Sequence, residues 1–451
     1  MSTIEAPRLR LRGAVVRDGD PGWDLARQAF NLTVDQRPVA VAFPADVADV
    51  QAVVRYAADA GLRVAPQRTG HNAAPLGSVE DAIVVRTDNL QGVRLDAARR
   101  HARVGAGHKW QDVVPAASEL GLAALHGSTG DVSVVGYSLG GGLGWYGRKH
   151  GLASNKVTAV ELVTADGELV RADRDTEPEL FWALRGGGGG NFGVVTAIEF
   201  DLVEQPLDYA GVLFFPWERT DEVLHAWHEW LPTTPDELTS VGRVLQFPPF
   251  PEVPEPLRGK AFALVEAVYL GSEADGRELL EPLRELGPAI DTFALVPPAE
   301  IAELHMDPPH PVAGVTAHTL LGELGAAGID ALVAAAGPES GSRLLSVELR
   351  QLGGALARTS PEHGALDMLR ADYAMFGVGI APEPALAAAS EAQLDAVLEA
   401  LAPWQAGLYS NFTEHRTGAS SFFVPETQAR LRAVKERLDP DDLFRANYVV
   451  D

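Results

Sequence analysis

The spacing of apolar and polar positions near the start of the chain predicts a β-α-β unit. Residues 39–43 form a short apolar run typical of a buried strand. Over residues 45–60 the apolar positions recur at the spacing of one helical face, at Val47, Val50, Val54 and Ala57. Gly61 follows as the expected C-terminal cap, and residues 62–65 as the returning strand. The loop after that strand lies where ligand sites are common in α/β sheets.

A second pattern, in residues 160–172, predicts a β-hairpin. Two strand-like runs flank Asp166-Gly167. This dipeptide is typical of a tight turn in which both central residues have a positive φ. The first 205 residues or so therefore mix both element types.

After about residue 205 the pattern changes and predicts a separate α+β unit. One helix is expected over 221–231, with Val223, Leu224, Trp227, Trp230 and Leu231 on one face before Pro232. Two strands are expected at 261–269 and 344–349, and two alanine-rich helices at 327–336 and 384–401. The proline-rich segment 246–259 predicts an extended surface loop, either a connector or the lining of a substrate entrance. We find no internal repeat.

Length and composition favour a soluble two-domain protein. A chain of 451 residues exceeds the roughly 250 to 300 residues at which single cores stop growing. No apolar run reaches about 18 residues, and the N-terminus lacks an apolar secretory signal, so we expect a cytoplasmic protein. A net charge of −25 argues against nucleic-acid and membrane partners. The absence of cysteine excludes disulfides and thiolate catalysis.

Three glycine-rich loops indicate a large phosphate-bearing cofactor. They are residues 68–72 around His71, residues 136–144, and residues 186–193. Glycine lets backbone N–H groups come close to phosphate oxygens, because it has no Cβ atom.

Two familiar motifs match parts of these loops. Residues 142–147 fit the G-x-G-x-x-G fingerprint, but Gly151 follows too soon for the long helix that a dinucleotide fold requires. Residues 136–140 fit the G-x-S-x-G elbow of serine hydrolases, with Ser138 as nucleophile. Glycines 140–144 interrupt the helix that should follow Ser138. A serine hydrolase is kept as the alternative function.

The same loops, taken in order, resemble the FAD-linked oxidases of the vanillyl-alcohol oxidase and p-cresol methylhydroxylase type. Residues 68–72 resemble the family's R-[ST]-G-G-H segment, one glycine short, and residues 127–152 resemble its berberine-bridge-enzyme-like branch. The segment ending in Gly193-Val194-Val195, the Tyr409-x-Asn411-Phe412 motif and the V-K-x-x-x-D-P-x-x-x-F ending at 434–444 are also similar. The resemblance covers residues 35–205 and 345–450.

This resemblance implies FAD, attached through its 8α carbon to His71. Doubly linked members of the branch carry a cysteine where this chain has Thr129, so we expect one covalent bond, as in members such as 6-hydroxy-D-nicotine oxidase. Tyr137 stands where many relatives have a histidine near the ribityl chain of the flavin. No histidine pair has the spacing of a zinc protease, so no metal site is expected.

The residues that the resemblance and the motifs assign to the site fall into two groups. The cofactor-binding group is Arg68, Thr69, Gly70, His71, Asn72, Thr129, Gly130, Val132, Gly136, Tyr137, Gly140, Gly141, Gly142, Gly144, Gly193, Val194, Val195 and Asn447. The catalytic group is Tyr409, as base, with Asn411 orienting the substrate, and Glu348 as a second carboxylate candidate. Strand alternation would place Glu348 and Arg350 on one face, where a plain ion pair is the other interpretation.

The prediction is an α+β, two-domain FAD-binding fold of the p-cresol methylhydroxylase type. Residues 1–205 and 402–451 would form the FAD domain, and residues 206–401 an inserted α+β substrate domain. The expected reaction is hydride removal from a C–O or C–N bond of a small molecule, with O2 as acceptor. Val132 occupies a small gate position in relatives that admit oxygen. Within this family, a flavin dehydrogenase or a non-catalytic flavin binder would also fit these residues.

Overall fold

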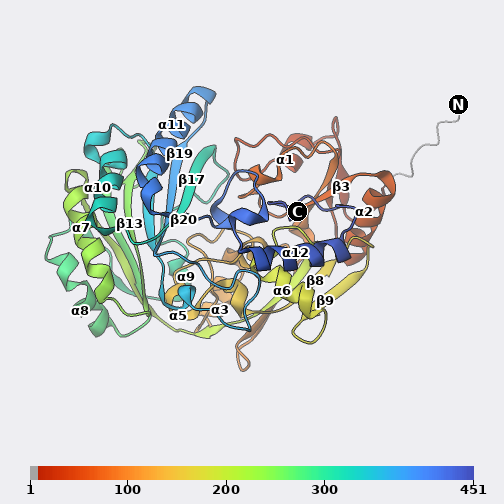
Figure 1. Ribbon diagram of the computed structural model, residues 1–451, viewed down its shortest axis with the longest axis horizontal. Helices are drawn as coiled ribbons and strands as arrows, with labels where there is room; N and C mark the ends of the chain where they lie inside the picture. Colours follow the sequence, from red (N-terminus) through yellow and green to blue (C-terminus); the bar gives the residue numbers. More distant parts are fainter. Residues whose placement is uncertain (1–8, 451) are drawn as a thin grey trace, which may run out of the picture.

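The computed structural model describes residues 9–450. Two groups of sheets lie side by side (Figure 1). Strands up to residue 204 form three smaller sheets, and strands from Asp208 to Gly407 form one sheet of nine strands. The chain then returns to the first group. Mixed helices and sheets in this arrangement confirm the α+β class, while the domain boundaries stay a prediction.

The first sheet has the order β1-β2-β4-β3. Its strands are β1 (Ala14–Val16), β2 (Ala40–Phe43), β3 (Arg63–Gln67) and β4 (Ala82–Arg86). Helix α2 (Val47–Ala60) connects β2 to β3. Asp46 is its N-cap, and the Asp46 carboxylate accepts a hydrogen bond from Asp49 N. Gly61 is its C-cap, with a φ of +65°. The predicted β-α-β unit is confirmed, but β4 lies between its two strands and pairs in parallel with both.

The second sheet is antiparallel, in the order β5-β6-β10-β8-β9. Its strands are β5 (Val93–Asp96), β6 (His101–Gly105), β8 (Val157–Val163), β9 (Leu169–Asp173) and β10 (Val194–Asp201). Strands β8 and β9 confirm the predicted hairpin. The predicted turn was wrong in detail: only Gly167 has a positive φ, because Thr164 N bonds to Glu168 O and closes a longer loop.

The large sheet has the order β15-β12-β14-β13-β18-β19-β17-β20, with β16 beside β12. Its strands are β12 (Asp208–Pro216), β13 (Leu238–Gln246), β14 (Ala261–Tyr269), β15 (Ile290–Asp291), β16 (Ala294–Val296), β17 (Gly314–Leu321), β18 (Ser346–Gln351), β19 (Tyr373–Ile380) and β20 (Gln405–Gly407). Its helices are α7 (Thr220–Trp230), α8 (Glu273–Arg284), α10 (Gly325–Ala336) and α11 (Pro384–Leu401). The predicted strands and helices of this part are confirmed within a few residues. The proline-rich segment is the β13–β14 connection.

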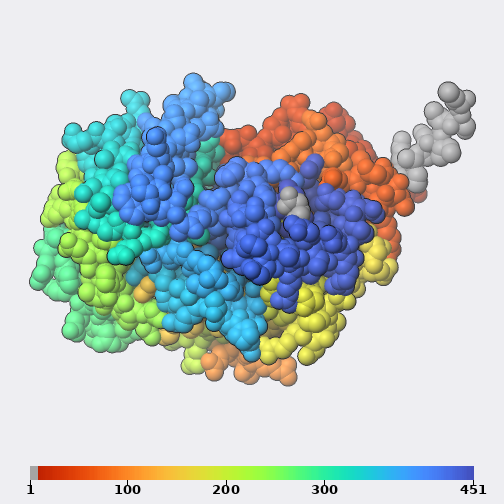
Figure 2. Space-filling model, viewed as in Figure 1, coloured from red at the N-terminus to blue at the C-terminus, as the bar shows by residue number. Residues whose placement is uncertain are grey.

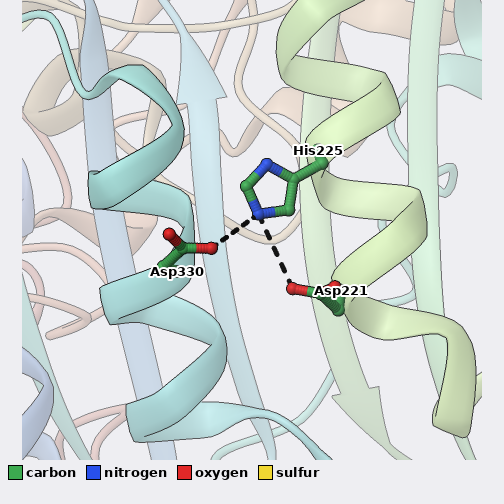
Figure 3. Close-up of side chains that lie close together, drawn as sticks. All are labelled: Asp221, His225 and Asp330. Carbon is green, nitrogen blue, oxygen red and sulfur yellow. Dashed lines mark hydrogen bonds and ion pairs between the residues drawn. The ribbon is translucent and has the colours of Figure 1, made fainter.

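Packing of the helices on the large sheet depends on the apolar face of α7. Val223, Leu224 and Trp227 are fully buried, and Trp227 Nε1 donates a hydrogen bond to Ser240 Oγ at 2.9 Å. On the outer side, His225 Nε2 lies 2.9 Å from Asp330 of α10 and 3.6 Å from Asp221 of its own helix (Figure 3). Buried aromatic packing and the His225 contacts together hold α7 against its neighbours.

The remaining elements range from two to fourteen residues in length. They are α1 (Trp23–Arg27), α3 (Val114–Ser118), β7 (Leu122–Ala123), α4 (Val134–Leu139), α5 (Gly147–His150), α6 (Pro178–Gly187), β11 (Val203–Glu204), α9 (Pro298–Ile301) and α12 (Pro425–Leu438). In the described part of the chain no helix has both the length and the apolar character needed to cross a bilayer.

The C-terminal segment joins the first sheet after α12. Asp439 accepts hydrogen bonds from the backbone N–H groups of Leu443 and Phe444 and pairs with Lys435 at 2.5 Å. Val64 of β3 then bonds to Leu443 O and Arg445 N. Figure 2 shows this segment lying across one face of the molecule, against the N-terminal part. The V-K-x-x-x-D-P ending therefore positions a backbone connection between distant parts of the chain.

Replacing Trp227 with alanine tests the packing of α7. We expect W227A to lower the free energy of unfolding by about 3 to 5 kcal/mol, because it removes a fully buried aromatic side chain. Leu25 is 76% exposed, so L25A serves as control and should change stability by less than about 0.5 kcal/mol. Denaturant unfolding followed by circular dichroism measures both, and equal midpoints for the two variants would contradict the assignment.

Candidate functional site

The His71 loop follows β3 and turns at Gly70. The φ of Gly70 is +78°, and a Cβ atom there would lie 2.9 Å from the Cβ of Ala29, so glycine is required. His71 stacks on Phe30 with ring centroids 3.6 Å apart, and its Nε2 lies 3.1 Å from Asp131 Oδ2. Asn72 donates to Ser410 O at 3.1 Å. The loop is thus held by three separate segments.

The second glycine loop is held by the C-terminal Tyr409-Ser410-Asn411 segment. Asn411 Nδ2 donates to Tyr137 O at 2.9 Å. A Cβ atom on Gly140 would lie 1.8 Å from Asn411 Oδ1. This side chain therefore packs directly on the backbone, and glycine at 140 is needed for close approach.

The third glycine loop contacts the end of the chain. Asn447 N bonds to Gly189 O at 3.0 Å, and the Lys435 ammonium donates to Asn191 O at 3.1 Å. Asn447 Nδ2 also donates to Asn72 O at 2.5 Å. One residue thereby connects the third loop to the His71 loop.

All three loops line one cavity of about 350 Å³. The predicted site residues that line it are Arg68, Thr69, Gly70, His71, Asn72, Thr129, Val132, Gly136, Tyr137, Gly140, Gly193, Val195, Asn411 and Asn447. The large sheet and the loops beside it also contribute to the lining, through Asp307, Arg350, Phe376, Phe412 and Glu414. The cavity is therefore enclosed by both groups of sheets.

Other predicted site residues lie behind the cavity wall. They are Gly130, Gly141, Gly142, Gly144, Val194, Tyr409 and Glu348. The glycines keep the loops compact: a Cβ atom on Gly144 would lie 2.0 Å from His126 O. None of residues 247–259 lines the cavity either.

Tyr409 contacts backbone rather than the cavity. Its side chain is 1% exposed, and its hydroxyl oxygen accepts hydrogen bonds from Gly142 N at 2.8 Å and Leu143 N at 3.2 Å. Its own N–H bonds to His318 Nε2 at 3.0 Å. Burial raises the pKa of Tyr409 far above its usual value. These contacts describe an anchor for the glycine loop, and the geometry does not support Tyr409 as base.

Glu348 lies in a buried charge network. Its carboxylate is 2.5 Å from Arg350 Nε and 2.7 Å from His305 Nε2. Glu266 contacts the other nitrogen of His305, and Arg243 joins both carboxylates. Burial alone would raise the pKa of Glu348, but Arg350 and His305 outweigh it and hold that pKa well below its usual range. The ion-pair interpretation of Glu348 fits this geometry, and the network presents Arg350 to the cavity.

Two carboxylates of the site did not stand out in the sequence. Asp131 is 3% exposed and contacts His71, and Glu414 lines the cavity. Asp131 is the only acidic residue in the glycine-rich segment 127–144, and this is the one sequence signal that could have identified it. Glu414 lies three residues after Asn411, just beyond the C-terminal motif, and nothing in its spacing marks it.

The two competing motifs do not have the required geometry. Ser138 lies inside α4, near its end, with 2% exposure, whereas a nucleophile elbow places the serine on an exposed strand-to-helix turn. The G-x-G-x-x-G match at 142–147 leads only into α5, a helix of four residues. A serine hydrolase is also not supported by the proteins that the chain resembles.

Comparison with known proteins gives consistent relatives. The model of the FAD binding domain family matches residues 38–173. The chain is 30% identical to (R)-6-hydroxynicotine oxidase of Paenarthrobacter nicotinovorans over 100% of its own length and 99% of the relative.

Solved structures agree with the sequence match. The crystal structure of 6-hydroxy-D-nicotine oxidase from Arthrobacter nicotinovorans superimposes with a TM-score of 0.84 at 28% identity, covering 99% of both chains. The Physcomitrella patens BBE-like 1 structure, at 21% identity, shares the fold with a TM-score of 0.83 over 98% of this chain and 97% of that one. With three glycine loops and His71 around one cavity, the match over the whole length of (R)-6-hydroxynicotine oxidase shows that the chain belongs to the FAD-linked oxidoreductases of the vanillyl-alcohol oxidase and p-cresol methylhydroxylase type.

Proposed function

We propose that this FAD-linked oxidoreductase is an oxidase that takes a hydride from a C–O or C–N bond of a small molecule and passes the electrons to O2. One observation carries the proposal: glycine backbone and His71 line the same cavity as Arg350, Phe376 and Glu414. The glycine backbone and His71 suit a cofactor, and the other three side chains suit a substrate with polar and aromatic parts. Val132 lines the same cavity and fits the proposed access of oxygen.

The cavity wall fits FAD. Asn72 Oδ1 and the Tyr137 hydroxyl are buried without a hydrogen-bond partner in residues 9–450. Buried polar atoms are normally paired, so a bound molecule supplies the partners. The glycine backbone of 188–190 lines the cavity, and its amides suit phosphate without requiring basic side chains. When bound, FAD supplies the two-electron acceptor.

A single covalent bond between FAD and His71 belongs to this proposal. His71 lines the cavity and has no protein hydrogen bond to its Nδ1 in the part of the chain that the structure describes. Thr129, which stands where doubly linked relatives have cysteine, lines the cavity as well. Since the chain has no cysteine, a second bond of that kind cannot form.

Glu414 is the proton acceptor that the geometry favours. Its carboxylate lines the cavity, accepts a hydrogen bond from Asn31 Nδ2 at 3.1 Å, and forms no ion pair with the residues that the structure describes. Asn31 follows Phe30, which stacks on His71, so Glu414 lies near the His71 end of the cavity. Burial raises the pKa of Glu414 to about 7. A base with a pKa near neutrality is well suited to take the O–H or N–H proton of a substrate.

Acid precipitation tests the bond to His71. Yellow colour should pellet with the wild-type protein and stay in the supernatant with H71A, because the variant lacks the nucleophile. Absorbance of both fractions near the flavin band measures this, and H225A, altered in the outer cluster of α7, should behave as wild type. Colour released from the wild-type protein would refute the bond, and absence of any flavin in the folded protein would refute the proposed function.

Replacing Glu414 with glutamine tests the proton acceptor. We expect E414Q to lower kcat/KM by about 10² to 10⁴-fold, because the amide cannot accept the proton. Since the base works deprotonated, wild-type kcat/KM should rise as pH increases through about 7, and E414Q should lose this rise. Peroxide release with alcohols and amines measures it, with E391Q on the exposed surface of α11 as control. An unchanged pH profile in E414Q would exclude Glu414.

Replacing Tyr409 with phenylalanine tests whether the Tyr409 hydroxyl holds the glycine loop or acts as the catalytic base. Two buried N–H groups lose their acceptor, so we expect Y409F to lose about 1 to 3 kcal/mol of stability. Its kcat/KM should keep the rise through about pH 7. Denaturant unfolding and the pH profile are measured on the same preparation. Full stability combined with a lost pH dependence would make Tyr409 the base after all.

A further inference from the structure

The contact between His71 and Asp131 is the one His–carboxylate pair in which the imidazole lines the cavity, among the residues that the structure describes. His71 Nε2 lies 3.1 Å from Asp131 Oδ2, and the Asp131 side chain is 3% exposed. His108–Asp112 and His225–Asp330 are pairs of the same type, but both lie outside the cavity with carboxylates 39% and 66% exposed. His305 also pairs with buried carboxylates, those of Glu266 and Glu348, but His305 does not line the cavity. Asp131 is therefore set apart by being a buried carboxylate whose histidine partner lines the cavity.

The Asp131 carboxylate is fixed from several sides. Its other oxygen accepts a hydrogen bond from Thr129 Oγ1 at 2.9 Å. Its loop is paired with the segment before α3: Gln111 N bonds to Gly130 O at 2.7 Å, and Trp110 N to Val132 O at 3.0 Å. Movement of Asp131 would break these contacts, so the carboxylate is a rigid partner for His71.

The His71 ring is equally restricted. Phe30 stacks on one face with an interplanar angle of 19°, and Asp131 contacts the Nε2 edge. A carboxylate beside Nε2 favours the tautomer in which that nitrogen carries the proton. The lone pair then resides on Nδ1, which has no protein hydrogen bond within residues 9–450. The ring is thereby oriented with its nucleophilic nitrogen free.

We propose that Asp131 is a positioning residue for covalent cofactor attachment, which holds His71 so that Nδ1 forms the bond to the 8α carbon of FAD. The inference rests on the proposed bond to His71. Beyond that bond, the inference names Asp131 as the positioning residue and Nδ1 as the attacking atom. It also gives Thr129 a role: Thr129 stands where doubly linked relatives have the cysteine of their second bond, and here its hydroxyl fixes Asp131.

Atoms and electrons balance in the attachment step. The 8α methyl group of FAD loses one proton, and its carbon forms a bond to Nδ1 while the imidazole proton leaves to solvent. The isoalloxazine ring takes up the two electrons released and two protons. O2 then accepts both electrons and both protons and leaves as hydrogen peroxide. During bond formation the imidazole is positively charged, and the Asp131 carboxylate stabilises this charge through Nε2–H.

Charges near Asp131 favour this role. Burial alone would raise the pKa of Asp131, but the hydrogen bond and charge of His71, with Thr129 and Lys109, keep that pKa below its usual value. The carboxylate is consequently ionised at neutral pH and available to a cationic imidazole.

The test follows covalent attachment and not turnover. Apoprotein is mixed with FAD in air, and the bound fraction that resists acid precipitation is measured over time, with intact mass confirming the adduct. We expect D131N to bind FAD without covalent attachment, or to attach it at least about 10²-fold more slowly than wild type. D131E, which restores a carboxylate, should recover part of the rate. D330N removes the carboxylate of an exposed His–Asp pair and should match wild type.

The outcomes distinguish the role of Asp131 from the proposed bond between His71 and FAD. Wild-type rates in D131N, with H71A unable to attach FAD, would overturn the role of Asp131 and leave the His71 bond intact. Attachment found through Nε2 in the digested wild-type adduct would overturn it too, because that nitrogen faces Asp131. No covalent FAD in wild type would overturn both. If D131N is not folded by circular dichroism, D131E decides: unimpaired folding with no recovered attachment counts against the inference.

Discussion

The site depends on the close contact between the Tyr409–Asn411 segment and the glycine loop at 140–143. The Tyr409 hydroxyl accepts two N–H groups of that loop, Asn411 donates to Tyr137 O, and Ser410 Oγ donates to Gly140 O at 3.2 Å. A side chain at position 140 would exclude Asn411. Because the two segments come from distant parts of the chain, this contact determines where the wall of the flavin-binding part meets the wall formed by the large sheet.

Local sequence signals predicted local structure well. The apolar stripe of α2 and its cap Gly61 are signals from one short stretch of sequence, and the structure confirms that helix to within two residues. The pairing between strands was harder to predict from the sequence. Strand β4 lies between β2 and β3, and no short-range pattern in residues 39–65 indicates this strand order. A hairpin was predicted over residues 160–172, but its turn type depends on the hydrogen bond from Thr164 N to Glu168 O, which the Asp-Gly dipeptide alone does not specify.

The candidate site shows the same division. Glycine motifs indicated the three loops that line the cavity, although Gly130, Gly141, Gly142 and Gly144 lie behind its wall. The roles of polar side chains were harder to predict, since they depend on which partner tertiary structure brings near. Tyr409 meets two backbone amides, Glu348 meets His305 from a loop more than forty residues away in sequence, and Glu414 meets the neutral amide of Asn31. The roles of Tyr409, Glu348 and Glu414 differ because their burial and the charge of their partners differ, and a sequence motif contains neither property.

The backbone connection between Val64 and residues 443–445 has a consequence for biosynthesis. Strand β3 leads directly into the His71 loop, yet its outer hydrogen bonds come from residues made almost four hundred positions later. On the ribosome the early part of the chain therefore emerges long before its partner, and Asn447, which holds the His71 loop, emerges later than residues 443–445. The contacts that Asn447 makes with the His71 loop and with the third glycine loop can therefore form only after translation has passed residue 447.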